Sequence, residues 1–95
     1  MEQQIADERA RITALDATLD NQRTPYLKAQ LRFATHMLDD AEAALRHAAK
    51  AQPRDAAMWM GFAAMNLQHA TETRAKVQAA VDSYGGPQNI VEVGG

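Results

Sequence analysis

Apolar residues recur every three or four positions along most of the chain, which is the spacing of one face of an α-helix. The clearest run follows Thr24-Pro25, a hydroxyl residue and a proline in the order typical of a helix start. Large and small residues nearly alternate along this run, which lets a neighbouring helix approach closely. The run predicts a helix over about 25–51, and its seam is Leu27, Leu31, Ala34, Leu38, Ala41, Leu45 and Ala48.

A narrower apolar stripe precedes Thr24. It consists of Ile5, Ile12, Leu15 and Leu19, and Glu8 interrupts it. A narrow stripe suits packing along a partner helix rather than deep burial. The pattern predicts a helix over about 2–21, separated from the next because proline disfavours the helical conformation at the residue before it.

A third helix is predicted over about 55–84, with Asp55 as its N-cap and the glycines before Pro87 at its end. Its second half has one ordinary stripe. Its first half is apolar on every side, which indicates burial on every side. The residues responsible are Met58, Trp59, Met60, Phe62, Met65 and Leu67.

Two interpretations of these six residues remain open. In the first, the third helix packs between the other two, and the six side chains are core. In the second, one side fills the core and another meets a second chain, where Met and Trp are common. The thin, alanine-rich stripes of the other helices favour the second, because they offer little surface to surround a helix.

The pattern as a whole predicts an all-α protein, either a small three-helix bundle or an extended helical hairpin with a short non-helical C-terminal tail. We expect one helical domain at 1–84 and a Gly-bounded tail at 85–95. The tail could pair as an edge strand with another chain. Its apolar residues therefore join the candidate protein interface: Ile90, Val91 and Val93.

Composition narrows the function classes. The formal net charge is −2 over 95 residues, and no basic patch stands out, so nucleic-acid binding is not expected. With no cysteine, disulfides, thiolate catalysis and thiolate–metal sites are excluded. The charged N-terminus does not resemble a signal peptide, and no apolar run is long enough for a membrane span. We expect a cytoplasmic location, or a place within a larger particle.

Candidate chemistry is sparse. His36 lies within one turn of Asp39 and Asp40, the spacing that a two-ligand metal site or an acid–base pair requires. A surface histidine near a carboxylate is commonplace, however. The sequence has no metal-binding His spacing and no glycine-rich phosphate loop. We therefore expect no enzyme activity, no metal and no cofactor.

Two short patterns resemble known families. Trp59-Met60-Gly61 resembles the Trp-x-Gly motif of small secreted helical hairpins, but there the motif lies in the turn between helices, and here it follows a helix start. The spacing of Ala41, Leu45, Ala48, Pro53 and Trp59 resembles one tetratricopeptide repeat. A second repeat is not present at the expected period, and neither resemblance identifies a family.

The expected function is thus non-enzymatic: a helical protein that associates with copies of itself or forms part of a larger assembly. Two alternatives stay open. One is a cytoplasmic chaperone or adaptor that binds an apolar helix or peptide. The other is a structural component of a phage particle or secretion apparatus.

Overall fold

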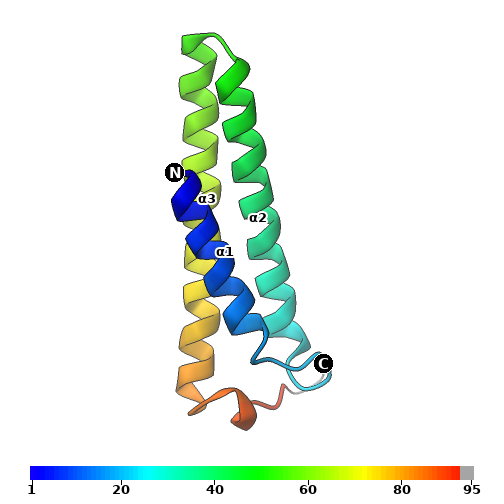
Figure 1. The fold of residues 1–95 in the computed structure, drawn as a ribbon. Coiled ribbons are helices and arrows are strands. Elements are labelled where there is room, and N and C mark those ends of the chain that lie inside the picture. Colours follow the sequence, from blue (N-terminus) through cyan, green and yellow to red (C-terminus); the bar gives the residue numbers. More distant parts are fainter. Residues whose placement is uncertain (93–95) are drawn as a thin grey trace.

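Three helices form the computed structural model, which describes residues 1–92. They are α1 (Glu2–Asp16), α2 (Pro25–Lys50) and α3 (Pro53–Ser83), and a short 3-10 turn, Pro87–Asn89, follows. Helices α2 and α3 pack as a long antiparallel hairpin, and α1 lies along only part of it (Figure 1). The molecule is extended, with dimensions of 50 × 23 × 17 Å. The predicted all-α class is confirmed, and residues 1–92 contain no strand.

The first helix is shorter than the predicted 2–21, because it ends at Asp16. The amide groups of Thr18 and Leu19 donate to the carbonyl oxygens three residues earlier, Leu15 and Asp16, both at 3.0 Å, which tightens the chain. The carboxylate of Asp20 then accepts hydrogen bonds from the amides of the next turn, at 2.6 and 3.1 Å. This side-chain acceptor offers the backbone an alternative to the helix.

The predicted start of α2 at Thr24-Pro25 is confirmed, but the Thr24 hydroxyl does not cap the helix. It donates to the Asp20 carbonyl oxygen at 2.8 Å and accepts the Asp20 amide at 2.9 Å. The cap comes from the tail instead. The carboxylate of Glu92 accepts the amides of Tyr26 and Leu27, at 2.7 and 3.0 Å. A negative charge here also complements the dipole of α2.

Both ends of α3 follow backbone rules. It begins at Pro53, so Asp55 lies in its first turn and is not the predicted N-cap. Proline suits the first helical position because its missing amide has no partner there. At the other end Gly85 has φ +81, and the amides of Gly85 and Gly86 donate to Asp82 and Val81, at 3.0 and 3.2 Å. This pair of bonds is a Schellman motif.

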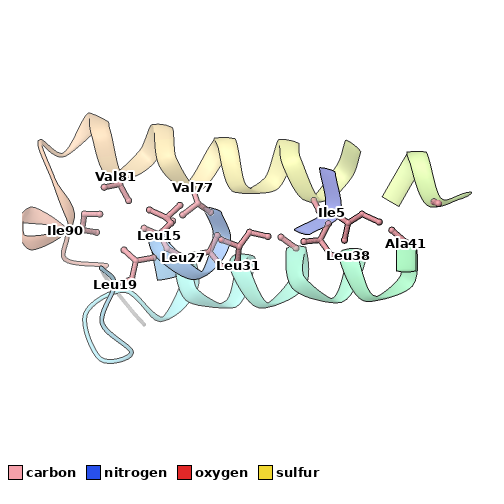
Figure 2. Packing of buried hydrophobic residues seen from close by; sticks show 14 of the residues in the cluster. Ile5, Leu15, Leu19, Leu27, Leu31, Leu38, Ala41, Val77, Val81 and Ile90 are labelled. Atoms are coloured by element: carbon pink, nitrogen blue, oxygen red, sulfur yellow. The ribbon is translucent and has the colours of Figure 1, made fainter. Parts of the chain in front are cut away.

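The tail folds back across the open end of the hairpin. The guanidinium of Arg23 donates to the carbonyl oxygens of Gln88 and Ile90, and the Glu92 amide donates to the Arg23 carbonyl oxygen at 3.1 Å. Ile90 is 1% exposed and belongs to the core (Figure 2). The described part of the tail is therefore a cover for this chain's own core.

The hairpin has two unlike halves (Figure 1). We call the part that α1 accompanies, with residues 25–40 and 68–83, the three-helix half. The remainder, residues 41–67, is the two-helix half. Apart from Ala34 and Ala70, the three-helix half buries large side chains (Figure 2): Ile5, Ile12, Leu15, Leu19, Leu27, Leu31, Leu38, Val77, Val81 and Ile90. In the two-helix half the buried residues are Ala41, Ala44 and Ala63.

Glu8 occupies a core position of α1, although its charge interrupts the apolar stripe. It is 1% exposed. The guanidinium of Arg74 from α3 donates to both of its carboxylate oxygens, at 2.7 and 3.0 Å. Burial raises the pKa of Glu8, but hydrogen bonds from Arg74 and Thr71 and the charges of Arg74 and Arg11 outweigh it, so the pKa lies below its ordinary value. This pair fixes α1 against α3.

Candidate interaction surface

The six apolar residues in the first half of α3 are not core. Met58, Met60, Phe62 and Met65 are between 41% and 48% exposed, and Trp59 and Leu67 are half-buried against the core. The interpretation in which the other helices enclose them is therefore wrong. The reason is length: α1 has 15 residues and α3 has 31, or about 22 Å against about 46 Å. In the two-helix half α1 reaches only the near edge, at Glu42 and Leu45, and beyond that edge only α2 packs on α3.

Met60 points to the side of the hairpin that carries α1. It lines a groove of about 530 Å³ that extends beyond the first turn of α1. The other lining residues from the hairpin are Leu45, Ala48, Ala49 and Ala56. Small side chains leave this groove shallow and mainly apolar. It continues along the hairpin the path that α1 follows in the three-helix half.

Trp59 and Phe62 point to the opposite side. They line a second groove, of about 310 Å³, together with Ala44, His47 and Asn66. The ring of His47 stacks on Trp59 with a centroid distance of 4.5 Å and an interplanar angle of 20°. Phe62 meets the Trp59 ring edge-on, with centroids 5.7 Å apart. This cluster holds Trp59 in place while leaving Phe62 open to solvent.

Met58 and Met65 share a third direction, away from both grooves. They are seven residues apart, or two helical turns, and are 48% and 47% exposed. Exposed thioether side chains adapt easily to the shape of a binding partner. The first half of α3 thus presents apolar surface on three sides.

The tail residues predicted for the interface have different positions. Ile90 lies in the core of its own chain, so it is not available to a second chain. Val91 is 66% exposed, next to the Glu92 cap of α2. Val93 lies outside the described residues. Ile90 is thus removed from the three tail residues that were predicted to contact a second chain.

The possible chemistry at His36 has little structural support. Its Nδ1 atom lies 3.9 Å from the Asp39 carboxylate, and both side chains are exposed. Within residues 1–92 no group of three or more histidine or acidic side chains is arranged to hold a metal ion. Among the helices described, none combines the length and hydropathy that crossing a membrane requires.

His47 is a member of the site that the sequence did not indicate. Its contact with Trp59 depends on how α2 and α3 align across the turn at 51–52. His47 and Trp59 each lie within about two helical turns of that connection. This closeness to the turn is the feature of the sequence from which their contact could have been predicted.

Comparison of the chain with protein-family models, with curated proteins and with solved structures gives no significant match.

Proposed function

We propose that this chain acts by protein–protein association, first of all with a second copy of itself, through the apolar side chains of the two-helix half. The observation that carries the proposal is the exposure of Met58, Met60, Phe62 and Met65, which we call the Met58–Met65 surface. The proposed role is non-enzymatic.

The two-helix half has no large buried side chain among the described residues. Its buried residues within the described chain are alanines, so it gains little from burial, whereas four large apolar side chains remain in solvent. Each apolar side chain that becomes fully buried contributes about 1.5–3 kcal/mol. A second chain over this half would recover that free energy, and aromatic and Met side chains are enriched in such interfaces.

The solution mass of the chain, measured by light scattering across a concentration series, tests the proposal. We expect a species of at least twice the mass of one chain. Single substitutions to Glu at each residue of the Met58–Met65 surface should identify at least one that lowers the mass without loss of helical circular dichroism. Ala75→Glu is the matched control, because Ala75 is an exposed residue of α3 in the three-helix half. A monomer at every concentration would contradict self-association.

A second candidate is an adaptor that binds an apolar helix of another protein. The groove beside Met60 favours it, since its lining is mainly apolar and it continues the path of α1. For this candidate the wild-type chain is a folded monomer, and Met60→Glu abolishes the binding of a partner while Ala75→Glu does not.

A further inference from the structure

The groove of Trp59 and Phe62 combines aromatic rings with hydrogen-bond acceptors. Its volume of about 310 Å³ is at the lower end of ligand sites, so it fits one side chain better than a cofactor. Among the described residues no lysine or arginine lines this groove. The lining residues that carry chemistry or close its floor are Asp40, Ala44 and His47 from α2, and Trp59, Phe62 and Asn66 from α3.

The carboxylate of Asp40 is the only full charge in the lining, and it has no ion-pair partner among residues 1–92. Its acidic neighbours differ, because Asp39 and Glu42 both bind the Arg9 guanidinium, at 2.6 and 2.9 Å. At about 100° per residue, Asp40 lies about 160° around α2 from Glu42, on the side away from α1. The groove therefore has an exposed negative charge that the chain itself does not neutralise.

Asn66 adds a neutral acceptor. Its side-chain nitrogen donates to the carbonyl oxygen of Phe62 at 3.0 Å. Because a carbonyl oxygen can only accept, this bond fixes which end of the amide lies on the helix. The side-chain oxygen of Asn66 takes no hydrogen bond from residues 1–92 and remains available to a donor.

The aromatic rings contribute negative potential of a second kind. The faces of aromatic rings attract cations that lie within about 6 Å of the ring centre. His47 stacks on Trp59 with centroids 4.5 Å apart, which holds the indole in place. Phe62 is 41% exposed, so part of its ring remains open to a ligand. A carboxylate, an amide oxygen and an aromatic ring along one groove suit a cation that also carries hydrogen-bond donors.

The guanidinium group fits this set of partners better than other biological cations. It is planar, stacks on aromatic rings and has five N–H donors arranged to meet a carboxylate. An ammonium group is compact and more strongly hydrated, which makes its transfer into a partly apolar groove less favourable. A quaternary ammonium group has no N–H donor, so it would leave Asp40 and Asn66 without hydrogen bonds.

We propose that the groove of Trp59 and Phe62 binds an arginine side chain of a partner protein. The guanidinium stacks on Phe62 and donates to the carboxylate of Asp40, with the Asn66 oxygen as a further acceptor. The arginine belongs to a polypeptide, because the groove offers no lysine or arginine to bind the carboxylate of a free amino acid. All the residues of this site come from one hairpin, so the site does not require the proposed self-association.

NMR titration of the ¹⁵N-labelled chain with the peptide acetyl-Gly-Arg-Gly-amide tests the inference. The indole of Trp59 is a specific reporter, since the chain has one Trp. We expect saturable shifts of this indole, of the Asp40 amide and of the Asn66 side chain, with a dissociation constant on the order of 1 mM for so small a ligand. The same peptide with citrulline, which keeps the shape but has no charge, should bind at least tenfold more weakly.

Two substitutions with equal change in net charge locate the site. Asp40→Asn should weaken binding of the arginine peptide at least tenfold, because a charge-assisted hydrogen bond is lost. Asp39→Asn is the matched control and should leave the dissociation constant unchanged, since Asp39 binds Arg9 on the α1 side. Phe62→Leu keeps an apolar side chain but removes the ring, and should weaken binding about threefold. Circular dichroism verifies that each variant is folded.

The outcomes separate this site from self-association. Citrulline binding equal to arginine binding, or no effect of Asp40→Asn, overturns the site. Equal affinity for the corresponding lysine peptide overturns the assignment to arginine. Light scattering on the same samples tests self-association: a monomer that shows the expected shifts contradicts self-association and supports the site. A chain that self-associates but shows no saturable shifts overturns the site alone.

Discussion

The two halves of the hairpin use the same pair of helices but bury different side chains. In the three-helix half, α2 and α3 enclose Leu31, Leu38 and Val77 with the help of Ile5 and Ile12 from α1. In the two-helix half, the helices meet through Ala41, Ala44 and Ala63. Alanine allows the helices to approach closely, yet it removes little apolar area from water.

This difference shows how one short helix divides a continuous hairpin. Where α1 is present, Lys28 and Asp39 of α2 pair with Asp16 and Arg9 of α1, and the apolar seam is closed. Beyond Glu2 the same hairpin has no third helix within the described residues, and large apolar side chains stay in solvent. Large buried side chains therefore concentrate in the three-helix half, whereas the Met58–Met65 surface lies in the other.

Truncation of a leucine in each half should give the largest difference in the free energy of unfolding. Leu31→Ala in the three-helix half removes a side chain that is 1% exposed, and we expect a loss of about 2–5 kcal/mol in the free energy of unfolding. Leu45→Ala in the two-helix half removes a half-buried side chain, and we expect about 1 kcal/mol. Urea unfolding measures both. Equal losses would show that Leu45 contributes as much to the stability of the fold as Leu31 does.

The Glu8–Arg74 pair gives a second, smaller effect, confined to the three-helix half. Glu8→Gln removes the charge but keeps the shape, and leaves the Arg74 guanidinium without its carboxylate. We expect a loss of about 1–3 kcal/mol near neutral pH. The matched control is Glu42→Gln, since Glu42 binds Arg9 at the surface, and a surface pair contributes less than about 1 kcal/mol.

The pH dependence of this effect follows from the pKa of Glu8. The folded pKa lies below its ordinary value, which is about 4.3 in an unfolded chain. The pair therefore stabilises the fold above that pH, and the contribution is lost as the pH falls through the folded pKa. The stability gap between wild type and Glu8→Gln should narrow on acidification. A gap that stays constant would mean that Glu8 acts through packing alone.

Much of the fold was predictable because it depends on local patterns. The four–three spacing between Leu27 and Ala41 specifies the buried seam of α2, and Thr24-Pro25 specifies its start. The role of Glu8 was not predictable, since its partner Arg74 is 66 residues away. Charge within an apolar stripe indicated an interruption, whereas the structure has a buried ion pair.

The candidate site was predictable in its residues but not in its arrangement. Exposure of the Met58–Met65 surface depends on how far α1 reaches along the hairpin, and its first turn lies beside Leu45 and Met60. The stacking of His47 on Trp59 depends on the alignment of the hairpin. The position of Ile90 depends on the bonds that Arg23 makes to the tail. Each of these is set by contacts distant in the sequence or by turn geometry.

The smallest expected effect concerns Gly61, an interior position in the first half of α3 within the two-helix half. A helical glycine costs about 0.5–1 kcal/mol relative to alanine, and a Cβ built at Gly61 meets no atom within 4 Å. Gly61→Ala should therefore raise the free energy of unfolding by that amount. Gly85→Ala is the control of opposite sign, because φ is +81 there and a Cβ lies 3.2 Å from the Asn89 side chain.

Hydrogen exchange shows which part of the molecule Gly61→Ala stabilises. If the two-helix half opens separately, Gly61→Ala should slow exchange of the amides of residues 53–67 and leave the slowest amides of the three-helix half nearly unchanged. Gly61 also points away from the groove of Trp59 and Phe62, since it lies about 100° around α3 from Phe62 and about 160° from Ala63. The substitution should therefore leave association through that groove intact. A destabilised or dissociated Gly61→Ala chain would instead mean that a second chain packs against this outer side of α3, where the Met58 and Met65 side chains would then form the contact.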